Sequence, residues 1–290
     1  MKKLHTLGLK VLLILLSSFL VSNSYADELE IYDTVAKKHI TTKELSALSA
    51  GDDIHIFGEF HNNQSIQNAQ ANLLESLVIN LKNQADFIVN WEFLNYEDAP
   101  KIQKHMLEFF KGQHTGLEIV SLLAGKQNIS YAPIFNVIKK LEGEVRGINI
   151  PRSIKQKIIK QGIDSVSSTY IPVSHYIGGP EYRERFKLAM GGHVTGELLN
   201  KYFEVQCLTD SVMAFEVAKN QYKQAQFVIA GSFHTDFFDA TVTRLQKLSP
   251  KKIWTYKFVS KSSHTTQEIE QFKQGHSTYG AYADYLVISK

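Results

Sequence analysis

Residues 53–61 read DIHIFGEFH, an apolar run that reaches Gly58 and ends on a histidine. Such a run, stopped by glycine, is typical of a buried β-strand, and apolar side chains then recur at helical spacing over residues 66–81. Strand patterns and helical patterns alternate along the rest of the chain, which predicts an α/β fold with a mostly parallel central sheet flanked by helices. We expect strands at 53–57, 86–93, 144–150, 226–230, 253–259 and 282–288, and helices at 66–81, 99–110, 117–123, 131–141 and 198–215.

Residues 165–192 interrupt this alternation. The segment is rich in glycine and proline and carries Tyr170, Tyr176 and Tyr182. We interpret it as an irregular or helical excursion from the α/β body. Such segments often carry function on a rigid scaffold, and the alternative is an insertion that only covers the sheet. Residues 29–48, before the first confident strand, form either a hairpin or a loose arm.

The first 26 residues have the pattern of a secretory signal peptide. A short basic region precedes an apolar run at 11–21, and Ser24 and Ala26 are the small residues expected before a cleavage site. A membrane span needs about 20 apolar residues, so a retained anchor is the weaker alternative. We predict cleavage after Ala26, one exported domain over residues 27–290, and no lipidated N-terminus, because no cysteine lies near the cleavage site.

The charge balance argues against nucleic-acid binding. The chain carries 32 basic and 29 acidic residues, but three lysines lie in the first 26 residues, where there is no acid, so the predicted mature chain is neutral. The one cysteine, Cys207, excludes an internal disulfide and lies within a helical pattern. We expect it to be buried as a small apolar side chain.

Two predicted strands end in the same way, with a glycine followed three residues later by a histidine: Gly58 with His61, and Gly231 with His234. Glu59 lies beside the first histidine, and Glu92 ends the strand at 86–93. Because ligands gather at the carboxyl ends of parallel strands, these side chains are expected to share one pocket. They could bind a divalent metal, act as general acid and base, or only cap strand ends.

Arg152 follows the strand at 144–150, after Pro151. It would reach the same edge of the sheet and could bind a carboxylate or phosphate with two hydrogen bonds. An ordinary surface arginine is the alternative.

An ordered set of short motifs in this chain resembles the ChaN family of bacterial haem-binding, iron-regulated proteins, which shares a superfamily with TraB-like proteins, Tiki proteases and erythromycin esterases. The resemblance covers residues 53–245. It is carried by Gly58-Glu59-x-His61, Glu92-Phe93, Asn149-x-Pro151-Arg152, the 206–214 stretch QCLTDSVMA and Ala230-Gly231-x-x-His234.

The resemblance implies an α/β body with a smaller helical lobe and haem as the ligand, handled between the periplasm and the outer membrane. In ChaN a dimer encloses two cofacial haems; each iron takes a tyrosine from one subunit, while histidine and lysine of the other hold the propionates. An outer-membrane haem receptor is then a possible partner. Many ChaN members are lipoproteins, and this chain departs from them in that respect.

The motifs themselves contain no tyrosine, so the haem ligand has to be chosen on chemical grounds. A phenolate is a hard donor that suits ferric iron, and it must lie where it can reach an interface. We favour Tyr176, then Tyr170 and Tyr182, with His175 and His193 as propionate or supporting partners.

The alternative function is a metal-dependent hydrolase that uses the pocket of Glu59, His61, Glu92 and His234. A metal-bound water would then be the nucleophile. The chain has no HExxH motif and no Cys/His cluster, which weakens this hypothesis. A purely structural or partner-binding exported protein is a third possibility.

Overall fold

We describe the fold from a computed structural model, which covers residues 29–49 and 51–290. The predicted signal peptide at 1–26 lies outside the described residues. The strands are β1 (Glu30–Asp33), β2 (Lys38–Ile40), β3 (Asp53–Glu59), β4 (Phe87–Asn95), β5 (Glu144–Asn149), β6 (Ala225–Gly231), β7 (Lys252–Ser260) and β8 (Tyr285–Ser289).

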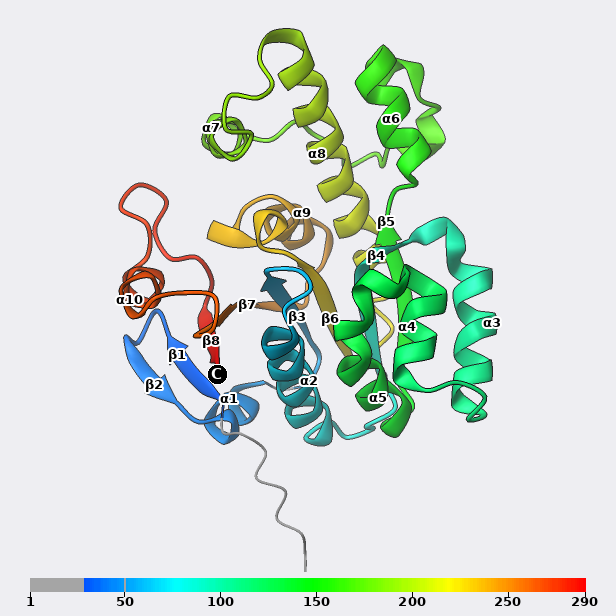
Figure 1. The fold of residues 1–290 in the computed structure, drawn as a ribbon, viewed down its shortest axis with the longest axis vertical. Coiled ribbons are helices and arrows are strands. Elements are labelled where there is room, and N and C mark those ends of the chain that lie inside the picture. The colour runs from blue at the N-terminus through cyan, green and yellow to red at the C-terminus, as the bar shows by residue number, and fades with distance from the viewer. Residues whose placement is uncertain (1–28, 50) are drawn as a thin grey trace, which may run out of the picture.

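These strands form one twisted sheet with the order β2-β1-β8-β7-β3-β6-β4-β5 (Figure 1). The six strands from β8 to β5 pair in parallel, and β1 pairs antiparallel with β8 and β2. The predicted mostly parallel α/β sheet is confirmed. The N-terminal segment that could be a hairpin or a loose arm is a hairpin, followed by α1 (Thr42–Leu48).

Helices cover both faces of the sheet. α2 (Gln64–Ile79), α3 (Ala99–Phe110), α4 (Gly116–Ala124) and α5 (Ala132–Lys140) lie on one side, and α8 (Gly196–Ala218) and α9 (Thr241–Leu248) lie on the other. β3 alternates between them: Phe57 packs in the cluster that contains α2, whereas Ile54 and Ile56 pack with α8 and α9. This period of two is why β3, at the centre of the sheet, is buried throughout.

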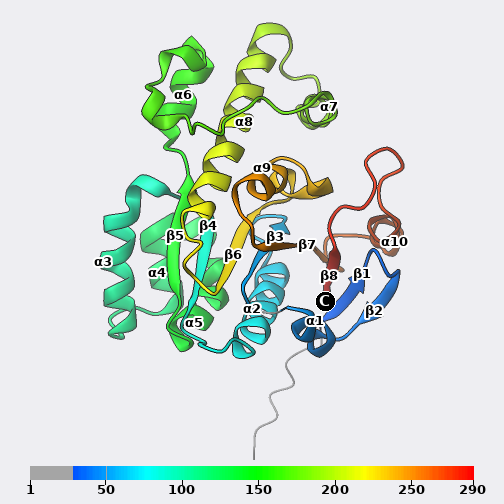
Figure 2. The ribbon, with the colours of Figure 1, turned by 180° about the vertical axis from the view of Figure 1, so that it is seen from behind.

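A smaller helical lobe stands beyond the carboxyl ends of the central strands (Figures 1 and 2). It consists of α6 (Arg152–Gln161), α7 (Pro180–Ala189) and the first half of α8. The segment at 165–192 begins with short 3₁₀ turns and ends in α7, so it is part helical and part loop.

The remaining helix, α10 (Thr266–Gln274), packs beside β8 and β1 at the edge of the sheet. Across residues 29–49 and 51–290, no helix has the length and apolar character required to span a bilayer.

Candidate functional site

Glu59, the last residue of β3, is buried at the carboxyl edge of the sheet and is 2% exposed. One carboxylate oxygen, Oε1, receives hydrogen bonds from Nδ1 of His61 at 3.0 Å and from the hydroxyl of Tyr131. The other, Oε2, accepts the amide of Gln67 at 2.8 Å. Because Tyr131 precedes α5 and Gln67 lies in α2, two helices hold this carboxylate in place.

Glu92 of β4 and His234, just after β6, form the second part of the site. Oε2 of Glu92 accepts the backbone N–H of Gly231 at 2.6 Å, and Oε1 lies 3.3 Å from Nε2 of His234. Nδ1 of His234 lies 2.6 Å from Oδ1 of Asp210, a fully buried residue of α8. The His234 ring is therefore held between two carboxylates, and Asp210 also accepts the hydroxyl of Tyr182 at 2.6 Å.

The two parts meet at the carboxyl end of β6, which lies between β3 and β4. Nε2 of His61 lies 4.0 Å from Oε2 of Glu92. Glycine at position 231 leaves room for the His61 ring, because a Cβ there would lie 2.8 Å from that nitrogen and displace the ring. The structure thus brings together the four residues that the strand-end motifs single out, Glu59, His61, Glu92 and His234.

The charges of this cluster support one another. Burial disfavours the charged form of His234, but Glu92 and Asp210 outweigh it and raise its pKa to about 10. Burial likewise opposes ionisation of Glu92, yet His234 and His61 lower its pKa to about 2. Burial also disfavours the His61 cation, and its hydrogen bond to Glu59 and the charge of Glu92 nevertheless raise its pKa. The site holds cationic imidazole beside carboxylate at neutral pH.

Arg152 is exposed at the first position of α6 and its side chain makes no hydrogen bond or ion pair in the described structure, so its role at the site stays a prediction. One turn later in α6, Lys155 is a basic group that interacts electrostatically with Glu92 and Asp210. Burial lowers the pKa of Lys155, against the opposing effect of those two carboxylates.

Asp210, Tyr131 and Gln67 were not predicted as site residues. Each belongs to or borders a helix that packs on the sheet, so no strand-end pattern marks it. Asp210 carried two usable signals: it lies within the 206–214 motif, and a carboxylate in the otherwise apolar middle of a helical stripe needs a buried partner.

The three candidate tyrosines lie in different environments. Tyr170 packs on the α6–α8 cluster, and its hydrogen bond to Glu97 raises the pKa of the phenol. Tyr182 is 1% exposed and donates to Asp210, so it does not meet the requirement of an accessible phenol. Tyr176 is half-buried; its ring lies 4.3 Å from the guanidinium carbon of Arg244 and 4.3 Å from Nζ of Lys247.

The two candidate histidines also differ. His175 shares a hydrogen bond of 3.0 Å with the hydroxyl of Ser211 and is partly buried. His193 is exposed, between the end of α7 and the start of α8. Cys207 is fully buried in α8, as predicted, and burial raises the pKa of its thiol to about 11.

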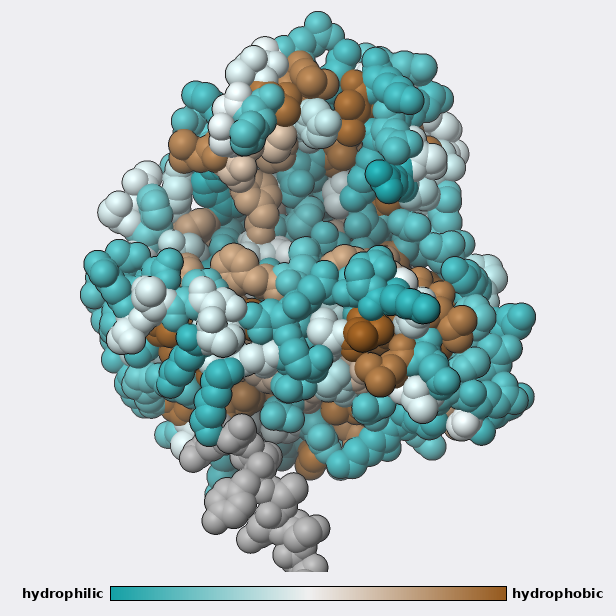
Figure 3. Space-filling model, viewed as in Figure 1, coloured by the Kyte–Doolittle hydropathy of each residue, from teal (hydrophilic) through white to brown (hydrophobic). Residues whose placement is uncertain are grey.

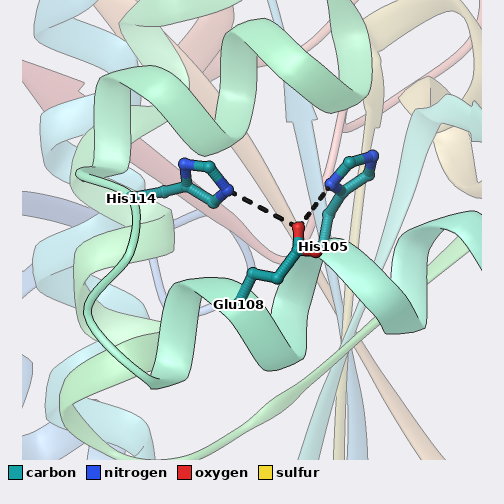
Figure 4. Close-up of side chains that lie close together, drawn as sticks. All are labelled: His105, Glu108 and His114. Atoms are coloured by element: carbon teal, nitrogen blue, oxygen red, sulfur yellow. Dashed lines mark hydrogen bonds and ion pairs between the residues drawn. The ribbon is translucent and has the colours of Figure 1, made fainter.

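A group of three potential metal ligands lies away from this site, on α3 and the turn before α4 (Figure 4). Oε2 of Glu108 lies 3.0 Å from Nδ1 of His105 and 3.6 Å from Nε2 of His114. Tetrahedral zinc with bonds of about 2.1 Å would separate its donors by about 3.4 Å, so the spacing suits that ion. In the described part of the chain, this is the one place where three His, Cys, Asp or Glu donors lie within 4.8 Å of one another.

Comparison with known proteins identifies the family of this chain. A family model described as haem-binding uptake, Tiki superfamily, ChaN matches residues 45–245. The chain belongs to this family. The match spans every residue of the strand-end site, so that site lies within the ChaN-family region. No curated protein matches the chain.

Solved structures show the same fold. ChaN of Campylobacter jejuni, in a structure of cofacial haem binding, superposes with a TM-score of 0.68 at 21% identity, covering 91% of this chain and 98% of that one. The type III effector HopBA1 gives 0.45 at 11% identity, covering 86% and 93%. An erythromycin esterase mutant in its open conformation gives 0.43 at 14% identity, covering 80% and 76%. The last two scores are too low to support an argument.

Proposed function

We propose that this protein binds ferric haem in haem or iron acquisition, with Tyr176 as the ligand to iron. The observation that carries the proposal is the match of residues 45–245 to a haem-binding uptake family. A tyrosine phenolate is an established axial ligand of ferric haem. Of the three candidate tyrosines, Tyr176 combines partial exposure with a cationic setting, whereas the phenols of Tyr170 and Tyr182 bond to carboxylates.

The surroundings of Tyr176 support this choice. Arg244 is buried and fixes the loop by donating to the Tyr176 carbonyl at 3.0 Å, while Lys247 is exposed on α9. Both cations lie against the ring of Tyr176, an attractive cation–π arrangement that holds the ring in place. Lys247 is also free to extend toward a propionate, and we assign His175 and His193 to the same supporting role.

Exposed apolar side chains near Tyr176 would suit a porphyrin face. Val173 is 103% exposed and Ile177 is 48% exposed, three residues before and one residue after the tyrosine. Apolar residues also reach the surface elsewhere on the helical lobe (Figure 3), among them Leu188 and Leu198. Such surface is costly to leave in water and is typical of a binding face.

We further propose that two copies of the chain bind two haems face to face, since cofacial haem binding is what the similar ChaN structure shows. Export to the periplasm through the segment at 1–26, and exchange of haem with an outer-membrane receptor, belong to the same proposal. The signal-peptide pattern at residues 1–26 supports the proposed export.

The test is a haemin titration of wild type, Tyr176→Phe and Tyr222→Phe, followed by absorbance. Tyr222 is a matched control, because it is a tyrosine 63% exposed at the other end of α8. We expect Tyr176→Phe to lose the ferric-phenolate spectrum and to bind at least about tenfold more weakly, a difference of about 1.4 kcal/mol. Equal spectra and affinities for all three proteins would contradict the assignment of Tyr176.

A second function is favoured by the strand-end site, namely hydrolysis by acid–base chemistry. Glu59 orients His61 through Nδ1, which leaves Nε2 facing the gap near Gly231. The side chain of His61 is 38% exposed, so its Nε2 is placed to take a proton from water. His234, held as a cation between Glu92 and Asp210, would then stabilise negative charge that develops on a substrate.

This second function predicts a pH profile. The neutral form of His61 would be the base, so activity on an ester should rise with pH through the raised pKa of His61. Glu59→Gln should move that rise to lower pH, because it removes the hydrogen-bonding carboxylate that raises this pKa. An activity that is unchanged in His61→Gln would exclude the hypothesis, and addition or chelation of divalent metal would show whether an ion takes part.

A further inference from the structure

Arg185 of α7 is a buried cation that lacks a carboxylate partner. Its side chain is 7% exposed, and one of its nitrogens, Nη1, donates to the backbone carbonyl of Asp236 at 3.0 Å. Nε and Nη2 are buried and have no hydrogen-bond partner among the described residues. Leaving a buried guanidinium with two unsatisfied donors is costly. These donors therefore indicate a binding site for a hydrogen-bond acceptor that the protein itself does not supply.

Aromatic rings surround the guanidinium and fix its plane. Its central carbon lies 4.8 Å from the ring centroid of Phe237, 5.3 Å from Tyr182 and 5.5 Å from Phe233. Tyr279, at the tip of the loop between α10 and β8, is 6.0 Å away. Nε and Nη2 form one straight edge of the guanidinium, and two parallel N–H donors at that spacing match the two oxygens of a carboxylate.

Arg185 also lines a cavity of about 360 Å³, whose other lining residues include Gly179, Tyr182, Phe237 and Tyr279. The first turn of α7 forms one wall. Pro180 has no N–H, and Gly179, the residue before the helix, provides no side-chain cap. The free N–H groups of that turn and the positive end of the helix therefore add to the attraction for an anion.

Two of the three acidic groups around the cavity are already engaged, and the third is exposed to solvent. Asp236 forms an ion pair of 2.8 Å with the buried Lys257, and Asp239 accepts the backbone N–H of Ala240 at 2.7 Å. Glu181 is exposed in the first turn of α7. Arg185 makes no ion pair with any of the three in the described structure, and its charge acts only at longer range on Asp236, which Lys257 already pairs.

The backbone of the opposite wall is strained. Phe237, Phe238 and Ala240 have φ values of 64°, 56° and 54°, a conformation that non-glycine residues rarely adopt. Strain of this kind is maintained where the surrounding structure requires it, and it often marks a ligand site. Here it places the Phe237 ring against Arg185 and the Tyr279 ring.

From these contacts we infer that the cavity beside α7 is a carboxylate-binding site, in which Arg185 holds the ligand through Nε and Nη2. Its volume suits a small organic acid or one carboxylate arm of a larger ligand. Both donors are buried, so a ligand reaches them only when a neighbouring side chain moves. Tyr182 lines this cavity, and its hydroxyl donates a hydrogen bond to Asp210 of the strand-end site. The two sites are therefore separate, and Tyr182 is the side chain that they share.

The test is binding of benzoate, measured by calorimetry and by the shift of thermal unfolding, in wild type, Arg185→Lys and Arg183→Lys. Arg183 is the matched control, an exposed arginine of the same helix. We expect saturable binding to wild type and Arg183→Lys, and at least tenfold weaker binding to Arg185→Lys, because lysine keeps the charge but loses the two-donor edge. No saturable binding to wild type, or equal binding to all three proteins, would overturn the inference.

A second variant guards against misfolding of Arg185→Lys. Gly179→Trp would block the mouth of the cavity and leave Arg185 in place, since a Cβ at position 179 meets no atom within 4 Å. We expect it to fold normally and to lose benzoate binding; undiminished binding would overturn the site. Inorganic phosphate that binds tenfold more tightly than benzoate would also overturn the carboxylate assignment.

Competition distinguishes the sources of the carboxylate. If haemin displaces benzoate and haemin dimethyl ester does not, the carboxylate is a haem propionate, and this arm alone rests on the proposed function. If neither displaces benzoate, the ligand is a free acid. Both results support the site, and the second does not depend on haem binding.

Discussion

Replacement of Glu92 by glutamine should change how the stability of this protein depends on pH. The raised pKa of His234, about 10 against about 6.5 when unfolded, means that the native state keeps a proton that the unfolded state releases. Stability from this group is therefore complete below about pH 6.5 and is lost as pH rises toward 10. Across that interval the loss is about 1.4 kcal/mol per pH unit.

Glu92→Gln removes one of the two carboxylates that raise the pKa of His234, the one with the larger coulombic effect, while Asp210 remains. We expect the slope of unfolding free energy between pH 8 and 9.5 to fall to about half of its wild-type value. The variant should also be less stable at pH 7 by about 3 kcal/mol, because a buried pair has lost one partner. The pH dependence in acid should change as well. In wild type, the stability that Glu92 contributes above about pH 4.5 is lost as pH falls toward 2, and the variant lacks this contribution.

Urea unfolding at a series of pH values measures these slopes directly. The exposed Glu142→Gln is the control, because it removes one negative charge on the surface. Ionisations that the proteins share cancel when the slopes are compared. Parallel curves for wild type and Glu92→Gln would refute the reasoning, since His234 would then not be held charged by Glu92.

Further perturbations test the packing around the site. Gly147→Ala should cost about 1–3 kcal/mol in urea unfolding, because the new Cβ would lie 2.3 Å from the carbonyl oxygen of Asn95; Gly179→Ala, which meets nothing within 4 Å, should cost little, and equal losses would contradict this. Leu73→Ala should cost about 2–5 kcal/mol, because Leu73 is fully buried in α2; a loss below 1 kcal/mol would be inconsistent with that burial. Cys207 should react with a thiol reagent only after unfolding, because it is buried and its pKa is about 11; rapid labelling of the native protein would contradict this.

The sheet could be predicted from sequence because its strands are short apolar runs that stop at glycine or polar residues. β3 and β6 show this most clearly, since each ends within two residues of its predicted limit and each places a histidine at the same edge. Order and pairing could not be read in the same way. Nothing in the local pattern says that β3 lies between β7 and β6, which depends on the crossovers of the whole chain.

The sequence predicts the part of the site that lies at strand ends, namely Glu59, His61, Glu92 and His234. Asp210 and Tyr131 come from helices far along the chain, so their contacts with His234 and Glu59 depend on how those helices dock. Tyr182 was placed among accessible tyrosines because its segment reads as irregular. The spacing of Tyr182 and Phe186, four residues apart in α7, is the signal that would have placed both on one buried helical face.

The central claim is that this chain binds haem through a tyrosine at an interface between two copies. Size-exclusion chromatography with light scattering, on residues 27–290 titrated with haemin, tests it most directly. The account predicts saturation at one haem per chain, a ferric-phenolate spectrum and a doubling of mass as haem is added. A protein that shows no saturable uptake of haemin, and whose mass stays unchanged, would contradict the claim.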